Sequence, residues 1–486
     1  MISFVLSLLA LFLGYQLYGR FVARIFAPDD RSTPAVAKAD GVDFIVLPSW
    51  KVFMIQFLNI AGTGPIFGAI MGMKFGPAAY LWIVFGCIFA GAVHDYFCGM
   101  LSMRNGGASQ PEIVGKYMGK AAQKGLLIFS VVVLLFVGTV YVYSPALILG
   151  GLMGGTQTIY WVWIIAIFVY YTLATMLPID KIIGRFYPIF GFAILFMAVA
   201  LCAVLFIKWP SLPEVWDIAS TPNKDGNPIV PCLFITIACG AISGFHSTQA
   251  PLMARCLADE HKGRAIFYGS MITEGVVALI WCTVSSWFFY GGGAAEVGLT
   301  EAAQAPEIVT HVSESWLGLV GGILAILGVV AAPITSGDTA FRSARLIIAD
   351  FFHFNQKPIA NRLAVSVPLF AITMALLWFN MENEKGFNTI WSYFGWSNQT
   401  LACCMLWTIT VYLARLRKPF WIALLPALFM TFTCSAFLFV FDNAFDLGTS
   451  VAYAVGSTCV IIGAVWFFWW YFKHSKTFPW DDVPLA

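Results

Sequence analysis

Charged side chains are scarce in this sequence of 486 residues: Asp, Glu, Lys and Arg make up 11% of it, and 60% of the residues are hydrophobic. A soluble domain needs more charge to cover its surface, so this balance argues against a soluble protein and favours a chain that has lipid as its solvent. The net charge is only +2 and no basic stripe is present, which argues against nucleic acid as a partner. The lipid bilayer is therefore the expected partner.

Motifs of catalysis and of covalent cross-linking are also missing. The 11 cysteines form no C-x-x-C pair and mostly stand in apolar runs, which indicates small buried hydrophobic residues rather than ligands or disulfides. The sequence contains no H-E-x-x-H motif, no paired haem ligands and no nucleophile elbow, so it does not predict an enzyme. Residues 1–19 lack a basic n-region and precede Arg20 and Arg24, so we expect a first helix that stays attached rather than a cleaved signal.

Long apolar stretches are what the sequence has instead. At about 20 apolar residues per crossing, the chain has room for about a dozen helices. The pattern predicts an all-α integral membrane protein, one transmembrane domain over 1–486, with about thirteen spanning helices. In chain order these lie near 1–26, 51–73, 77–103, 124–150, 158–177, 184–208, 228–252, 265–290, 316–341, 361–380, 387–413, 419–441 and 447–472.

The basic residues test this count. The loops are numbered from the first predicted helix onward. Of the 27 Lys and Arg residues, 23 lie in the odd-numbered loops and the C-terminal tail, and the even-numbered loops contain only Lys74, Lys208, Lys224 and Lys385. The positive-inside rule then predicts an N-terminus outside the cell membrane and a C-terminus in the cytoplasm. A miscounted helix would scramble the alternation, so the alternation favours the count.

A short sequence motif occurs twice in the chain, and so does a glycine-rich interruption of a predicted helix. Gln110–Val114 (Q-P-E-I-V) follows the third predicted helix, and Ala305–Val309 (A-P-E-I-V) follows the eighth, on the opposite side by the charge rule. The second helix is interrupted at Gly62-Thr63-Gly64-Pro65 and the seventh at Gly240-Ala241-Ile242-Ser243-Gly244. Both pairs are five helices apart, as an inverted repeat of five plus five helices requires.

The interruptions predict a substrate site. A break at mid-membrane depth frees backbone groups that lipid cannot satisfy, so it must be buried in protein or line a wet cavity. Half-helix N-termini then suit an anionic group, whereas close packing by small residues is the alternative interpretation. An amide pair in the eleventh helix lines the cavity or joins helices. The predicted substrate-binding residues are Ala61, Gly62, Thr63, Gly64, Pro65, Gly240, Ser243, Gly244, His246, Asn398 and Gln399.

Polar residues in three other helices are candidates for coupling to an ion. Hydroxyls and one carboxylate at the end of the ninth helix suit a small cation, or a carboxylate that takes up a proton. His94 and Glu274 lie at similar depth, which allows a proton relay. Local hydrogen bonds are the alternative. The predicted ion-coupling residues are Thr335, Ser336, Asp338, Thr339, His94, Asp95 and Glu274.

A resident metal or other cofactor is not expected. His94 and His246 are the only two intramembrane histidines that invite the idea, and the sequence gives them no further evident ligand.

Six short sequence motifs resemble those of the carbon starvation protein A (CstA) family and occur in the same order along the chain. They are Asp40-Gly41, Ile60–Ile66, Gly91–Asp95, Cys239–His246, Ile334–Ala340 and Asn398-Gln399. The likeness runs over most of the chain. It implies a bacterial or archaeal cytoplasmic-membrane transporter of peptides or pyruvate, coupled to H⁺ with Na⁺ as the alternative, and related to amino-acid and polyamine transporters with a LeuT-like core.

The resemblance also implies a division of the chain. Residues 51–413 would form a ten-helix core, with an extra helix at 1–26 and two peripheral helices at 419–472. The chain is short for the family, whose longer members carry further C-terminal helices.

The sequence as a whole predicts a secondary transporter that takes up a small carboxylate-bearing nutrient by alternating access, in an unspecified oligomeric state. A channel-type facilitator, which also uses broken helices and a polar pore, is the first alternative. It would give unitary currents and no uphill accumulation. A membrane-bound enzyme is the second.

Overall fold

The computed structural model contains helices and connecting loops, with no strand, among the residues that it describes, which are 1–41, 43–176, 179–356, 358–382, 386–442 and 444–477. The helices are α1 Ile2–Leu13, α2 Gly19–Phe26, α3 Pro34–Ala37, α4 Ser49–Ile60, α5 Gly64–Gly72, α6 Ala78–Phe85, α7 Ala92–Arg104, α8 Gln110–Met118, α9 Lys120–Leu152, α10 Gln157–Met176, α11 Ile179–Lys208, α12 Ile229–Thr236, α13 Phe245–Ala254, α14 Gly269–Tyr290, α15 Gly293–Glu296, α16 Ala305–Phe352, α17 Ile359–Glu382, α18 Gly386–Arg415, α19 Trp421–Val440 and α20 Gly448–His474. Lys385, which the charge rule uses, lies outside the described residues, as do the side chains of Lys181 and Arg185.

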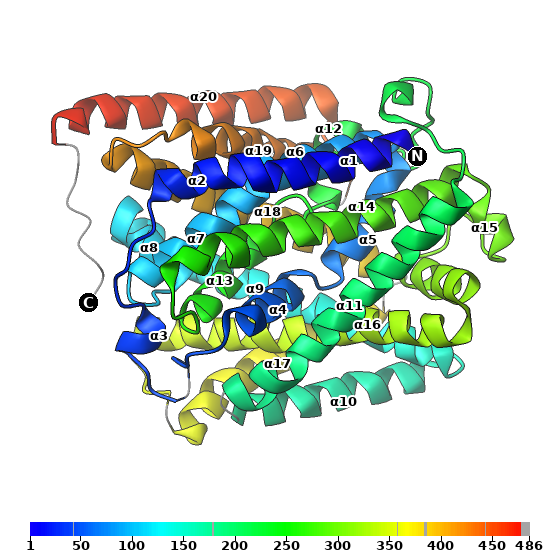
Figure 1. Ribbon diagram of the computed structural model, residues 1–486, viewed down its shortest axis with the longest axis horizontal. Helices are drawn as coiled ribbons and strands as arrows, with labels where there is room; N and C mark the ends of the chain where they lie inside the picture. Colours follow the sequence, from blue (N-terminus) through cyan, green and yellow to red (C-terminus); the bar gives the residue numbers. More distant parts are fainter. Residues whose placement is uncertain (42, 177–178, 357, 383–385, 443, 478–486) are drawn as a thin grey trace.

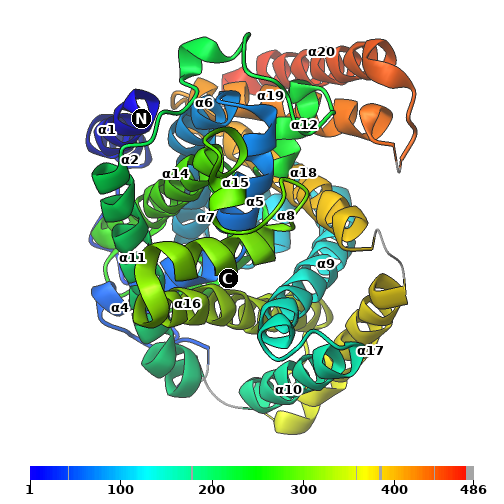
Figure 2. The same ribbon diagram turned by 90° about the vertical axis from the view of Figure 1, so that its right-hand side faces the viewer.

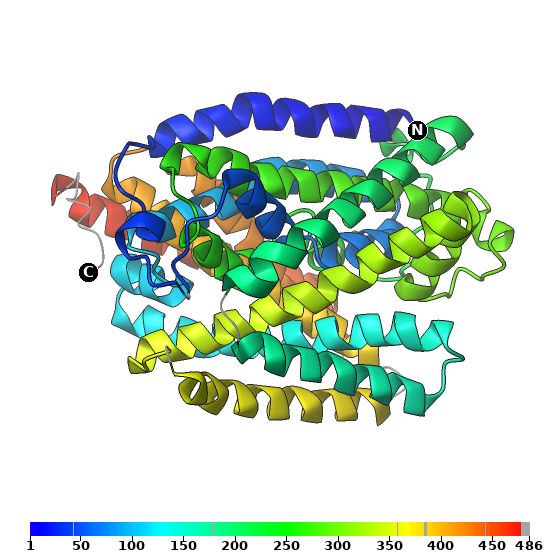
Figure 3. The same cartoon turned by 60° about the horizontal axis from the view of Figure 1, so that its bottom comes forward.

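The helices form an outer set around a buried middle. α1, α19 and α20 lie on one side and α10 and α17 on the opposite side, with α5, α7 and α13 between them (Figures 1 and 2). The turned view in Figure 3 again has α1 at one edge and α17 at the other. Every residue of α13 is buried, whereas α20 buries only Ala452, Gly456 and Phe467. The polar side chains of α13 therefore face protein, and the apolar surface of α20 suits lipid.

Ten helices of the described chain are long and apolar enough to cross a bilayer, and eleven if Ser49–Ile60 and Gly64–Phe75, which meet at a bend of 43°, are one span. These eleven match eleven of the thirteen predicted spans. The other two, 228–252 and 387–413, correspond to α12 with α13, which a break separates, and to the more polar α18. The full count of thirteen stays a prediction.

The ninth predicted helix is longer than the sequence indicates. It was expected over 316–341, with Thr335 and Thr339 near its end, but α16 continues to Phe352, and its apolar spanning part begins at Gly321. Arg342 and Arg345 follow the hydroxyls and look like an interfacial end, yet both are buried against other helices. The hydroxyls therefore lie well inside the part of α16 that follows the kink at Gly318.

The two similar sequence motifs, Gln110–Val114 and Ala305–Val309, each form the first turn of a helix. Gln110 begins α8 and Ala305 begins α16, each with a proline in the first turn. The backbone N–H of Ser109 donates to Glu112 at 2.7 Å, and that of Gln304 donates to Glu307 at 3.2 Å. A carboxylate that reaches back to the start of its helix is half of a capping box, so both motifs specify a helix N-terminus.

Both predicted interruptions are present in the backbone. Residues 61–63 lie outside helix between α4 and α5, and residues 237–244 lie outside helix between α12 and α13. Gly240 has φ +90°, a conformation that glycine adopts without strain. Gly64 and Pro65, which the sequence analysis places inside the first break, instead open α5, because proline fits the first helical turn.

Gly244 offers a test of how tightly the second break is packed. A Cβ atom at this position would meet the backbone of Asn398 and Ala402 on α18. We expect Gly244→Ala to destabilise the protein by roughly 1–3 kcal/mol, because backbone atoms cannot give way to the added methyl group. Gly125→Ala on α9, where a Cβ meets nothing within 4 Å, is the matched control, with no expected loss. Thermal unfolding in detergent measures both; equal stability of the two variants would contradict this packing.

Candidate functional site

The first break is held by a side chain from α16. In an unbroken helix the carbonyl of Leu58 would accept a hydrogen bond from the amide four residues on, which lies in the break. Ser336 Oγ donates to that carbonyl at 3.1 Å instead. A Cβ at Gly62 would lie 2.9 Å from the Tyr141 ring and 3.2 Å from Ser336 Oγ, so only glycine leaves room for this arrangement.

The second break is held by Asn398 of α18. Its Oδ1 accepts from the N–H of Phe245 at 2.6 Å, and its backbone carbonyl accepts from the N–H of Gly244 at 3.2 Å. Its Nδ2 donates to Ser243 Oγ at 2.9 Å. Gln399 Nε2 donates to the carbonyl of Phe234, on the other side of the break, at 3.0 Å. The amide pair thus replaces hydrogen bonds that the unwound backbone has lost.

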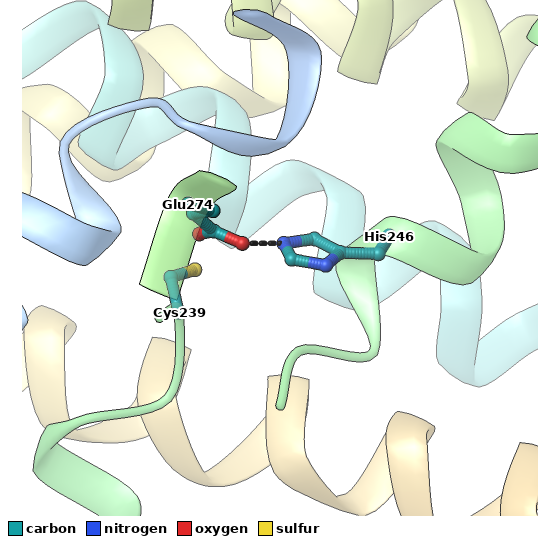
Figure 4. Close-up of side chains that lie close together, drawn as sticks. All are labelled: Cys239, His246 and Glu274. Carbon is teal, nitrogen blue, oxygen red and sulfur yellow. Dashed lines mark ion pairs between the residues drawn. The ribbon is translucent and has the colours of Figure 1, made fainter. Parts of the chain in front are cut away.

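A chain of buried ionisable side chains leads to the same break. One carboxylate oxygen of Asp95 on α7 lies 2.8 Å from Nδ1 of His94, and the other lies 2.8 Å from Nδ1 of His246. The other ring nitrogen of His246 lies 3.6 Å from Glu274 Oε2 on α14 (Figure 4). Glu274 Oε1 accepts from the N–H of Gly240 at 3.1 Å. All four side chains are fully buried, so the chain connects three helices to the unwound backbone.

His94 and Glu274, expected as a relay pair, are both in this chain but do not face each other. His246, expected as a substrate ligand, lies between Asp95 and Glu274. Depth along a helix was the only available signal, and it does not say which helix faces which. The proton role of His94, Asp95 and Glu274 stays a prediction.

A second buried carboxylate lies near the first break. Tyr187 of α11 donates its hydroxyl hydrogen to Asp338 Oδ2 at 2.7 Å and lies 3.2 Å from the carbonyl of Thr335. The hydroxyls of Thr335 and Thr339 donate to carbonyls of their own helix, at 2.8 Å and 3.0 Å. Tyr187 was missed from the sequence, where one tyrosine in an apolar stretch carries no signal.

A polar cavity of about 350 Å³ lies next to the second break. Ile235 and Thr236, near the end of α12, line it together with Met71 of α5 and Trp391 of α18. Its charged lining residues are Lys74, Asp225 and Asp442. Burial raises the pKa of Asp225 above its ordinary value, against hydrogen bonds from Asn227 that lower it. The cavity therefore offers both signs of charge beside the break.

Asn398 allows a direct test of how the break is held. We expect Asn398→Ala to destabilise the protein by roughly 1–3 kcal/mol, because it leaves the N–H of Phe245 buried without its partner. Thr410→Val is the matched control on the same helix, because the Thr410 hydroxyl bonds only to Leu406 of its own helix. Thermal unfolding of the purified variants measures the difference. Similar losses in both variants would show that Asn398 does not support the break.

Comparisons with known proteins agree with the sequence resemblance. The family model described as carbon starvation protein CstA matches residues 1–159, 152–315 and 291–436. An uncharacterized membrane protein of Haemophilus influenzae is 44% identical over 339 residues, which cover 60% of this chain and 91% of that protein. The peptide transporter CstA of Bacillus subtilis is 27% identical over 530 residues, which cover 88% of each chain.

The fold is also found among solved structures. The crystal structure of MhsT in complex with L-phenylalanine matches with a TM-score of 0.56 and 12% identity, over 85% of this chain and 97% of that one. This likeness shows the LeuT-like transporter fold.

Proposed function

Because this chain belongs to the carbon starvation protein CstA family, we propose that it is a secondary transporter that takes up peptides by alternating access and is driven by a coupling ion. The observation that carries the proposal is the pair of unwound segments, 61–63 and 237–244, each held by polar side chains of neighbouring helices. Unwound backbone between helices in a membrane-spanning fold is where transporters bind substrate and ions.

Peptides fit the charges beside the break. A peptide has an ammonium at one end and a carboxylate at the other, and the cavity is lined by Lys74 together with Asp225 and Asp442. Relatives described as peptide transporters support the same substrate class. Pyruvate is the second candidate, because the ammonium of Lys74 in the cavity lining suits any carboxylate. Pyruvate has no ammonium, so the acidic lining residues favour the peptide.

We assign the transport core to residues 51–413, as an inverted repeat of five plus five helices. Two pairs of features support the repeat: the two breaks, and the two sequence motifs that begin α8 and α16. The members of each pair are five predicted helices apart. Residues 1–26 and 419–472 then lie outside the core, in line with the small buried fraction of α20. The alternation of basic loops supports thirteen crossings, an outside N-terminus and a cytoplasmic C-terminus in the cell membrane.

The coupling ion is a proton carried by Asp338, with Na⁺ as the alternative. Asp338 is a buried carboxylate inside a spanning helix, and such a group is costly unless it has a partner or a function. Among the described residues, Tyr187 donates a hydrogen bond to it through its hydroxyl. Ser336, two residues before it, bonds to the first break, so a change of charge at Asp338 acts close to the substrate.

Substrate class is tested by counterflow in proteoliposomes. We expect vesicles loaded with dialanine to accumulate labelled dialanine, and a pH gradient, acidic outside, to drive its uptake above equilibrium. Vesicles loaded with pyruvate are the parallel arm. Pyruvate counterflow without dialanine counterflow would overturn the peptide assignment, and unitary currents without accumulation would establish the channel instead.

The coupling residue is tested by Asp338→Asn. We expect uptake driven by the pH gradient to fall by about tenfold or more, whereas exchange of dialanine across the membrane continues, because only the coupling step loses its titrating group. Asp446→Asn, at an exposed position, is the control and keeps both activities. If the pH gradient still drives uptake by Asp338→Asn at the unaltered rate, Asp338 is not the coupling residue. If a sodium gradient, and not a pH gradient, drives uptake by the unaltered protein, the coupling ion is not a proton.

A further inference from the structure

Three different metal-ligating side chains converge at the second break. Cys239 lies in the unwound segment, His246 on α13 and Glu274 on α14 (Figure 4). One sulfur, one ring nitrogen and one carboxylate oxygen from them lie within 4.8 Å of one another, and all three residues are buried. Zn²⁺ ligands at about 2.0–2.3 Å from the metal lie at most about 4.4 Å apart, so a small side-chain rotation brings all three atoms onto one cation.

Two of the three converging atoms have no hydrogen-bond partner among the described residues, and the third, Cys239 Sγ, makes only a long hydrogen bond to Ser243 Oγ at 3.5 Å. His246 Nε2 and Glu274 Oε2 have no hydrogen-bond partner, although both are buried. The opposite atoms of the same side chains are occupied, because Nδ1 bonds to Asp95 and Oε1 accepts from the N–H of Gly240. An ionised carboxylate only accepts, so Nδ1 of His246 carries a hydrogen toward Asp95, and in the neutral ring Nε2 presents a lone pair. Nε2 lies 3.6 Å from Glu274 Oε2, and a cation between the two atoms, either a proton on the ring or a metal ion, stabilises this arrangement.

The surroundings of His246 are those of a supported metal ligand. Metal-binding histidines usually donate their second ring N–H to a carboxylate, which fixes the orientation of the ring. Asp95 is that carboxylate, at 2.8 Å, and His94 holds its other oxygen, also at 2.8 Å. The sequence gives His94 and His246 no further evident ligand, because Cys239 and Glu274 become neighbours of His246 only in the fold.

We propose that Cys239, His246 and Glu274 bind one divalent transition-metal cation, with Zn²⁺ the best match. A mixed sulfur, nitrogen and oxygen set is typical of Zn²⁺, and three protein ligands leave a fourth position open. A thiolate and a carboxylate together balance the two charges of the cation in a buried place. The binding does not depend on the transport function proposed above.

Such a cation would tie the two ends of the break together. Cys239 precedes the centre of the unwound segment and His246 follows it, while Glu274 anchors both to α14. α12 and α13 must move relative to each other if access alternates around the break, as the transport function proposed above requires. Bound Zn²⁺ therefore inhibits transport, and its removal by a chelator restores it.

The binding test uses the purified full-length protein, stripped with a chelator and dialysed. We expect one Zn²⁺ per chain by equilibrium dialysis, and with Cd²⁺ as the probe a thiolate-to-metal absorption band. Cys239→Ser abolishes the band and His246→Gln and Glu274→Gln weaken Zn²⁺ binding. Asp95→Asn keeps the band but weakens binding roughly 10- to 100-fold, as loss of an orienting partner does. Cys403→Ser, a buried cysteine on α18, changes neither.

Each outcome decides the proposal separately from transport. The band and the stoichiometry of the unaltered protein need no variant, so a misfolded variant cannot leave the question open. A folded protein that binds no Zn²⁺ and gives no band with Cd²⁺ would overturn the site and leave a proton as the cation between His246 and Glu274. A band that survives in Cys239→Ser would assign the metal to another cysteine and would also overturn it.

Discussion

Backbone that leaves its helix inside a bilayer has to find polar partners within the protein, because lipid offers none. This requirement organises the centre of the molecule. Ser336 supplies the partner for the carbonyl of Leu58 at the first break. Glu274 supplies a partner for the amide of Gly240 in the middle of the second break, and Asn398 supplies one for the amide of Phe245 at its end. Small residues such as Gly62 and Gly244 let the partner helices come close enough.

The partners come from helices other than the broken ones, and this has a mechanical consequence. α16 holds the first break, and α18 and α14 hold the second, so either break can rearrange only if these neighbours exchange their hydrogen bonds. The same neighbours carry the buried carboxylates Asp338 and Glu274. A cation that arrives at either carboxylate therefore acts on a helix that supports unwound backbone. This is the physical link between ion and cargo in the transport that we propose.

The sequence predicts the parts of this arrangement that depend on local pattern. Apolar stretches located the spanning helices, and Gly-rich interruptions at Gly62 and Gly240 located both breaks. What depends on contacts between helices was not accessible. Tyr187 is one tyrosine among many, and nothing local says that it meets Asp338. Cys239 and Glu274 are 35 residues apart in numbering and meet only because the chain leaves helix between α12 and α13. The length of α16 was misjudged because buried arginines look, in sequence, like the end of a span.

The central claim is that the unwound segments hold the cargo, and hydrogen exchange measured by mass spectrometry tests it most directly. The account predicts that saturating dialanine slows the exchange of backbone amides in residues 61–63 and 237–244, while the amides of α20 exchange as before. Exchange at both segments that is unaffected by a peptide which the protein demonstrably transports would contradict the account.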